Sequence, residues 1–298
     1  MSDFMFEVID VTQSIIDGVL FGSTYALIGI GFTLIFGVMQ KLNMSYTAAS
    51  LAGAYVGLGF FTLLNIAPVL VFSISIIASG FIGFVVYIFC FRFINVDNHL
   101  AALMASVGGL FFIDEIIIHA TNASPLAFPS LFSDVILELG VFGFRGDLLF
   151  VFGTCIVSMM LLWLLLYRSS FGLATRAVSQ QAIAAQLCGI DLHRTNAITF
   201  VVTGMLGGIA GVMIGAAVGI LSPLLTVPFT VKGLIVTVMG GLGSIPGAII
   251  AGFLVGALEN VFLFFRGVDE RDMYIMVLLF VFLVFRPHGI FSKQANRD

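Results

Sequence analysis

A run of twenty uncharged, mostly apolar residues, LLFVFGTCIVSMMLLWLLLY at 148–167, is the feature that most restricts how this chain folds. An α-helix needs about 20 such residues to cross the hydrocarbon core of a bilayer. Only 9% of the 298 residues are charged, whereas a soluble domain carries about 25%. We therefore expect the bilayer to be the solvent of the whole chain.

Similar runs recur along the sequence and predict about nine spans, within limits of about eight and ten. They lie at residues 18–38, 44–64, 67–91, 99–118, 148–167, 196–216, 229–243, 246–265 and 273–286. Two of these, 229–243 and 273–286, are short, and whether 229–243 crosses completely stays open. The predicted fold class is an all-α, polytopic transmembrane helix bundle in one domain, 1–298.

The basic residues predict the orientation, because cytoplasmic loops carry an excess of Lys and Arg. With the N-terminus outside and the C-terminus inside, eight of the twelve basic residues fall on the inner side. These are Lys41, Arg92, Arg168, Arg176, Arg194, Arg286, Lys293 and Arg297. The first 17 residues hold four acids and no Lys or Arg, so we expect no cleavable signal peptide.

The order of the spans is compatible with an internal repeat. Four predicted spans precede the fifth and four follow it, and the second set starts from the opposite face. That arrangement is typical of inverted repeats in transporters whose substrate path lies between the halves. Glycine-rich segments at 207–211 and 240–252 favour closely packed helices, because small residues let transmembrane helices approach one another.

No catalytic motif is recognisable in the sequence. The G-x-x-x-x-G-K-[ST] loop is absent, so we expect no nucleotide site and no cofactor bound by this chain itself. The four histidines lack metal-ligand spacing, and Cys90, Cys155 and Cys188 are too far apart for a metal or disulfide framework. GLGSIPG at 241–247 is better interpreted as a tight break between two membrane segments. We expect a protein that is not an enzyme and holds no metal.

Glu259 lies inside an otherwise apolar span. A charge at a helix centre costs roughly 2.5–3.5 kcal/mol on insertion scales, and such residues usually face the bundle interior or a water-filled path. Lys232, near the outer end of the preceding span, is the candidate partner. A functional role and simple placement at the outer interface both stay open.

A polar, basic insert, RSSFGLATRAVSQQAIAAQLCGIDLHRT at 168–195, interrupts the apolar chain. Its three arginines and one aspartate would cost on the order of 10 kcal/mol at the bilayer centre, so we place it on the inner face. Its middle favours a helix that ends at Gly189 and carries Ala182, Ala184 and Ala185 on its surface. A flat docking face and an ordinary amphipathic surface helix both fit this pattern.

Part of the insert resembles the cytoplasmic coupling loop of ATP-binding-cassette importer permeases. The residues that carry the resemblance are Ala184, Ala185, Gly189, Ile190, Asp191 and Arg194. Three more segments resemble the branched-chain amino acid permease family, in the same order and over nearly the whole chain. They are GSTYALIGIGFTLIFGVMQKLNMSYTAASLAGAYV at 22–56, LIVTVMGGLGSIPGAIIAGFLVGALE at 234–259 and LLFVFLVFRPHGIF at 278–291. The chain is most similar to the shorter of the two permease subunits.

One segment departs from the family pattern. The family commonly has Asn-Phe-Ala-His-Gly where this chain has Asn43-Met44-Ser45-Tyr46-Thr47. The departure weakens any carry-over of substrate preference. The solute path is predicted near this segment and the glycine break at 240–247. For the four polar residues of the segment at 43–47, helix capping stays open as an alternative role. The predicted path residues are Asn43, Ser45, Tyr46, Thr47, Gly240, Gly241, Gly243 and Ser244.

The resemblance implies a translocation subunit in the inner membrane of a bacterial cell, for branched-chain amino acids or a related small polar solute. The implied partners are a second permease subunit in a heterodimer, two ATP-binding subunits that hold ATP and Mg, and an external solute-binding protein. Nucleic acid is not an expected partner. A stand-alone secondary transporter or channel is the alternative.

Overall fold

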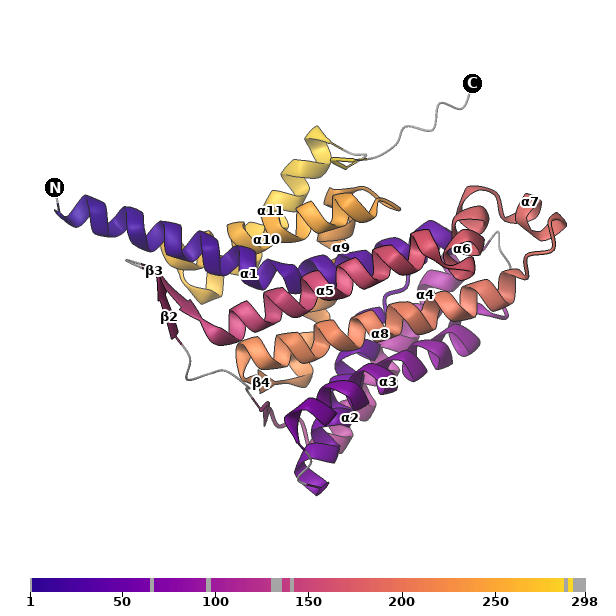
Figure 1. The fold of residues 1–298 in the computed structure, drawn as a ribbon, viewed down its shortest axis with the longest axis horizontal. Coiled ribbons are helices and arrows are strands. Elements are labelled where there is room, and N and C mark those ends of the chain that lie inside the picture. The colour runs from indigo at the N-terminus through magenta and orange to yellow at the C-terminus, as the bar shows by residue number, and fades with distance from the viewer. Residues whose placement is uncertain are drawn as a thin grey trace.

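A computed structural model of the chain describes residues 2–64, 67–94, 98–129, 136–139, 142–286 and 289–291 (Figure 1). Within these residues, eight helical segments are long and apolar enough to cross a membrane. They are α1 (Ser2–Met39), α2 (Tyr46–Leu64), α3 (Pro68–Val86) with the π-helical turn η1 (Tyr87–Phe91), α4 (His99–Thr121), α5 (Gly146–Arg168), α8 (Leu192–Val218), α9 (Thr226–Gly240) with the preceding 3-10 turn η2 (Pro223–Leu225), and α10 (Ile245–Arg266). The predicted helical membrane bundle is confirmed, and these segments correspond to the first eight predicted spans.

The seventh and ninth predicted spans, the two short ones, differ in the structure from what their apolar runs suggest. The seventh segment is longer than 229–243, because η2 and α9 together form a span of 18 residues, Pro223–Gly240. The helix α11 (Val268–Phe285) covers the ninth predicted span. Its first turns carry four charged residues, Asp269, Glu270, Arg271 and Asp272. A full crossing by α11, and hence a count of nine, stays a prediction, as do the inverted repeat and the membrane orientation.

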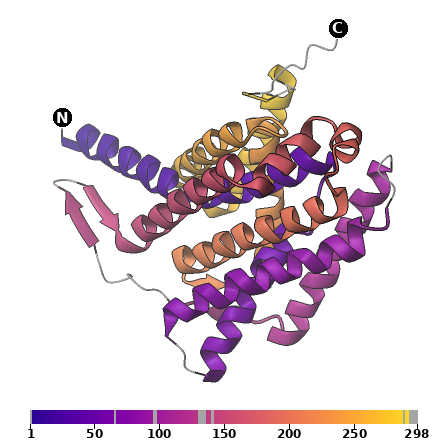
Figure 2. The ribbon, with the colours of Figure 1, turned by 45° about the vertical axis from the view of Figure 1, so that its right-hand side comes forward.

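Shorter elements lie at the two ends of the bundle. The helices α6 (Ser170–Gln180) and α7 (Ala182–Leu187) cap one end, which we call the loop end. Strands β2 (Ile136–Leu139) and β3 (Phe142–Arg145) form an antiparallel ribbon at the other end, beside the N-terminal half of α1 (Figure 2). Two residues each of β1 (Leu126–Ala127) and β4 (Ile220–Leu221) also pair antiparallel. The sequence analysis did not predict these strands, which are too short to show a periodic pattern.

The helix α1 occupies the centre of the bundle. Within its most apolar 18 residues 83% are buried by other parts of the chain, against 22% for α4. Figure 1 shows α1 lying alongside α10 and α5. An apolar helix that contacts protein on all sides needs no polar face, which explains why α1 shows no amphipathic pattern.

Glycine lets α10 approach α1 closely. A methyl group at Gly18 would lie 2.6 Å from the carbonyl oxygen of Gly256, and one at Gly22 would lie 2.8 Å from that of Gly252. Hydrocarbon solvent supplies no hydrophobic drive between helices, so this close backbone packing has to hold them together. A similar contact joins α3 to its neighbours, where the Ser79 hydroxyl is 2.7 Å from the Gly204 carbonyl and 3.1 Å from that of Ala49.

We predict opposite effects for two glycine substitutions in this fold. Gly256→Ala places a methyl group against the backbone of Gly18 and Gly22, and should destabilise the chain by about 1–3 kcal/mol. Gly153→Ala meets nothing within 4 Å, and should stabilise α5 by roughly 0.5–1 kcal/mol because alanine is the better helix former. Denaturation in detergent, followed by circular dichroism, measures both. Equal effects of the two substitutions would contradict the packing described here.

Candidate functional site

The insert at the loop end folds into two helices rather than one continuous helix. Ser169 caps the N-terminus of α6, and its hydroxyl accepts a hydrogen bond from the Gly172 backbone N–H at 3.0 Å. The chain breaks at Gln181, whose backbone is extended (φ −155°, ψ 102°), and α7 follows directly. Asp191 then caps the N-terminus of α8, with its carboxylate accepting from the backbone N–H groups of His193 and Arg194. The two capping side chains and the extended backbone at Gln181 therefore divide the insert into separate short helices.

The predicted helix stop at Gly189 is confirmed in detail. Gly189 has φ +87°, a backbone conformation that glycine adopts without strain. Its N–H donates to the Gln186 carbonyl at 3.0 Å, and the Ile190 N–H donates to the Ala185 carbonyl at 3.1 Å. This pair of bonds is the Schellman pattern that closes a helix C-terminus. It fixes the direction in which the chain leaves α7.

The exposed face of α7 is not the alanine face that the sequence suggested. Ala185 is buried, with 5% of its surface exposed, and Ala182 and Ala184 are half-buried. Ile183 and Leu187 are instead 72% and 86% exposed. They lie four positions apart and so share one side of the helix. The prediction was wrong for Ala185, which packs into the core cluster, while the larger apolar residues of the short helix are turned outward.

The remaining residues of the coupling pattern have separate positions. Asp191 works as the helix cap described above, while Arg194 is exposed one position beyond His193. The side chain of Ile190 is half-buried and packs against the core. The pattern therefore combines residues that shape the loop with residues that are free to meet another protein.

The predicted path residues at the start of α2 are all buried. The Asn43 carboxamide oxygen accepts from the Ser45 hydroxyl at 2.7 Å and from the Ser45 N–H at 3.2 Å. This geometry supports the capping alternative for Asn43, and it leaves the Ser45 hydroxyl engaged as a donor to the Asn43 side chain. The hydroxyls of Tyr46 and Thr47 have no hydrogen-bond partner among the described residues. Tyr46 packs its ring edge-on against Phe32 of α1, with the ring centres 5.2 Å apart.

The predicted glycine break is a tight turn between α9 and α10. Gly241 and Gly243 have φ +100° and +87°, and Ser244 begins α10 by accepting a hydrogen bond from the Gly247 N–H at 3.3 Å. A methyl group at Gly240 would lie 2.5 Å from the Ala248 nitrogen. The glycines here are therefore required by backbone conformation and by close approach.

The C-terminal segment folds onto this turn. The Ile290 N–H donates to the Met239 carbonyl at 2.9 Å, and the Phe291 N–H donates to the Gly240 carbonyl at 3.3 Å. Gly289 has φ +81° and lies against Gly241. Two segments that the sequence analysis noted separately, 234–259 and 278–291, thus form one structural unit at the loop end.

A cavity of about 710 Å³ opens beside the turn. Its lining comes from the C-terminal part of α1, the last turn of α5, the helix α6, residues 242–246 and Phe291. Gly243 and Ser244 are predicted path residues that line it, whereas none of Asn43, Ser45, Tyr46 and Thr47 does. The structure therefore does not bring the two predicted parts of the path together in one cavity.

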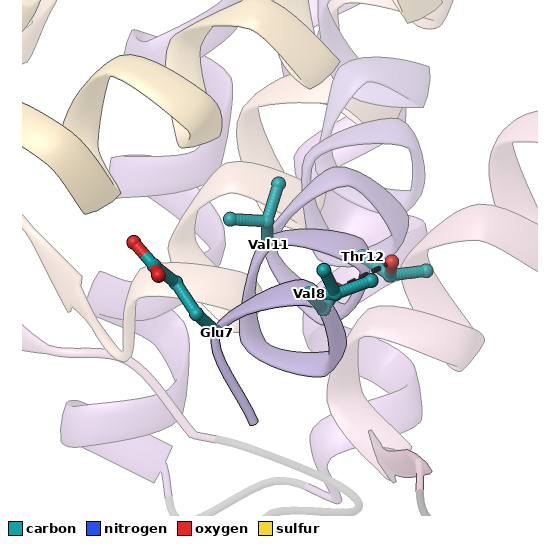
Figure 3. Close-up of a pocket in the computed structure, with 4 residues that line it drawn as sticks. All are labelled: Glu7, Val8, Val11 and Thr12. Carbon is teal, nitrogen blue, oxygen red and sulfur yellow. Dashed lines mark hydrogen bonds between the residues drawn. The ribbon is translucent and has the colours of Figure 1, made fainter. Parts of the chain in front are cut away.

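A second, smaller hollow of about 290 Å³ lies near the N-terminus, where Glu7, Val8, Val11 and Thr12 of α1 line it (Figure 3). The Thr12 hydroxyl donates to the Val8 carbonyl of the same helix at 2.7 Å. Because all four residues come from one helix, no groups converge on a ligand from different elements. This hollow is not a candidate site.

Lys232 and Glu259 form the ion pair that the sequence suggested. The Lys232 ammonium donates to Glu259 Oε1 at 2.8 Å, with both side chains at most 6% exposed. Sequence reasoning missed two further members of the cluster. Arg271 Nε lies 3.1 Å from Glu259 Oε1, and Asp272 Oδ1 lies 3.0 Å from the Lys232 ammonium. The sequence feature that could have indicated them is their position, because both charges lie directly before the ninth predicted span.

This four-residue group, the charge cluster, joins the middle of α9 to the second half of α10 and the start of α11. It has two positive and two negative charges, so they balance. The Lys232 ammonium also lies 5.7 Å from the ring centres of Tyr25 and Phe229. Asp272 remains 47% exposed, so one edge of the cluster reaches the surface. The cluster allows charged residues to be buried in an apolar bundle and fastens α11 to α9 and α10.

Residues 14–285 match the family described as "Branched-chain amino acid transport system / permease component". The chain belongs to this family. The permease is 29% identical to the high-affinity branched-chain amino acid transport system permease protein BraD of Pseudomonas aeruginosa, over 96% of this chain and 97% of the relative. It is 27% identical to LivH of Escherichia coli (strain K12), over 94% of this chain and 95% of the relative. A probable LivH of Methanocaldococcus jannaschii is 25% identical, over 93% and 92%.

The family match confirms several predictions. The permease is a multi-pass membrane protein of a transport system and not an enzyme. Similarity along nearly the full length favours the importer-permease interpretation over a stand-alone secondary transporter or channel. A permease component implies further components of the same transport system.

The charge cluster of the permease gives a prediction for stability. Lys232→Met leaves the buried Glu259 carboxylate with Arg271 alone, and should lower the free energy of unfolding by about 3 kcal/mol. The double variant Lys232→Met/Glu259→Met should lose less than the sum of the two single variants, because no unpaired buried charge remains. Arg266→Met, at the exposed end of α10, is the control and should change little. Strict additivity of the two single effects in detergent unfolding would show that the pair is not coupled.

Proposed function

We propose that this chain is the membrane-spanning permease subunit of an ATP-binding-cassette importer, and that residues 168–195 transmit the work of partner ATPases to the bundle. The observation that carries the proposal is the exposed apolar face of α7, Ile183 and Leu187, on a helix held by the Schellman turn at Gly189. An isolated apolar face at a polar, basic loop is costly in water and suits a protein contact.

The loop is also placed to pass motion into the bundle. Asp191 caps α8, which runs through the bundle and packs against α2 and α3. Ala185 anchors α7 on the core at the same time. A displacement of α7 by an ATPase would therefore reach α8 through the four-residue connection, 188–191. Such coupling is an equilibrium between two arrangements of the bundle, which the partner ATPases bias. ATP and Mg are held by those partner subunits and not by this chain.

The proposed assembly contains a second permease subunit, two ATP-binding subunits and an external solute-binding protein, in a bacterial inner membrane. The proposed solute is a branched-chain amino acid or a related small polar molecule, because full-length relatives are named for branched-chain amino acid transport. The altered segment Asn43-Met44-Ser45-Tyr46-Thr47 leaves room for a different member of this class. The buried hydroxyls of Tyr46 and Thr47, which lack partners among the described residues, are the proposed path contacts on α2.

We predict that Leu187→Asp separates the permease from its ATPase. The substitution puts a charge on the exposed face of α7 without touching the core, so the fold should survive. Docking faces often depend on one or two apolar anchors, whose loss costs about tenfold or more in affinity. Both ATP-driven uptake into proteoliposomes and co-purification of the ATP-binding subunits should fall by at least that factor.

Phe93→Asp is the matched control. Phe93 is 78% exposed and follows η1, outside α6 and α7. Lys41, in the loop after α1, donates to the neighbouring Ile94 carbonyl at 3.3 Å, which places this control at the same end of the bundle. It should leave uptake and co-purification intact. If Leu187→Asp behaves like the control in both measurements, the proposed docking is wrong.

A further inference from the structure

The cavity at the loop end has the size and the lining of a small-molecule site. Its volume of about 710 Å³ falls in the range of about 300–1,000 Å³ that ligand pockets occupy. Five segments from distant parts of the sequence enclose it, which distinguishes it from the single-helix hollow in Figure 3. Most of its lining is apolar, with a few polar groups and one charge. That combination is typical of sites that hold a ligand by one polar end.

Arg176 is the one charged residue among the described residues that line this cavity. Its guanidinium carbon lies 5.0 Å from the ring centre of Tyr167, another lining residue. Its Nε donates to the Gly172 carbonyl in its own helix at 3.3 Å. In the described part of the chain, no carboxylate oxygen lies within the 4.0 Å of an ion pair with it. Among the described residues, the positive charge of Arg176 is therefore not balanced by an acid.

Thr33 adds a second, independent indication. It lines the cavity and is only 1% exposed, and its hydroxyl has no hydrogen-bond partner among the described residues. Other hydroxyls of the lining are already engaged: Thr175 donates to the Phe171 carbonyl and Ser179 to the Arg176 carbonyl. Buried hydroxyls usually find partners. Thr33, with an unpaired hydroxyl, and Arg176, a cation without an acid among the described residues, line the same cavity, which points to a ligand that supplies an acceptor.

We propose that this cavity is a binding site for a small anion with an apolar body, held by Arg176 and Thr33. The described lining contains no carboxylate to receive an ammonium group. The site therefore selects the anionic end of a molecule, and a zwitterionic amino acid is held by its carboxylate alone. A ligand in this cavity contacts α6, which leads into α7, and the turn between α9 and α10. It bridges the proposed docking loop and the glycine break.

Two sources can supply this chemistry, a carboxylate solute and the headgroup of an anionic lipid. The probe is radiolabelled 4-methylpentanoate, which has a branched apolar body and a carboxylate but no ammonium group. Binding is measured by equilibrium dialysis on the full chain in nanodiscs of phosphatidylcholine, and again in discs that contain phosphatidylglycerol. Leucinamide, which has the same body and an ammonium group but no carboxylate, is the competitor. ATP and partner subunits are absent, so the result does not depend on the proposed docking.

The proposal predicts that Arg176→Gln weakens binding at least about tenfold, since a hydrogen-bonded charge pair is lost. Arg176→Lys should retain part of the affinity. Arg168→Gln, an exposed arginine that does not line the cavity, should bind as the unmodified chain does. Thr33→Val should weaken binding without lowering the stability to unfolding, because the hydroxyl makes no bond within the described chain.

The two lipid compositions identify the source. Equal binding in both kinds of disc supports a free carboxylate solute, whereas loss of the probe in phosphatidylglycerol discs supports a lipid headgroup in the same site. Three results would overturn the proposal: Arg176→Gln binds as well as Arg168→Gln in phosphatidylcholine discs, leucinamide competes as well as unlabelled 4-methylpentanoate, or the probe does not bind in phosphatidylcholine discs.

Discussion

Close packing of α10 on α1 is the contact on which the rest of the bundle depends. A bilayer offers no hydrophobic drive between helices, so α1 keeps its central place through backbone approach at Gly18, Gly22, Gly252 and Gly256. With α1 fixed, α5, α8 and α9 pack around it. The same helix then supplies Thr33 and its neighbours to the cavity at the loop end. The site is therefore a consequence of how one helix is surrounded.

The charge cluster complements this packing at the other end. Lys232 and Glu259 are buried in mostly apolar segments, and the start of α11 brings Arg271 and Asp272 to them. The C-terminal end of α11 leads to Gly289 and Ile290, which contact the end of α9 and the turn after it at the loop end. α11 is thus attached to the α9–α10 pair at both of its ends.

Sequence reasoning predicted the features that follow from composition and local chemistry. The spans followed from uncharged length, the stop at Gly189 from glycine conformation, and the Lys232–Glu259 pair from the cost of isolated charge in a membrane. It failed where burial depends on neighbours. Ala185 of α7 is buried because it packs into the core cluster, and no local pattern shows this. The cavity around Arg176 combines five distant segments, and the short strand pairs have no periodicity to detect.

The central claim is that α7 faces the cytoplasm and contacts an ATP-binding partner, and labelling of Cys188 tests it most directly. Cys188 adjoins α7 and is exposed, whereas Cys90 and Cys155 are buried, so a membrane-impermeant thiol reagent should report on this position. We expect labelling in inside-out vesicles and not in right-side-out vesicles, with protection when the ATP-binding subunits are co-expressed. Labelling from the opposite side, or labelling that the subunits leave unchanged, would contradict the account.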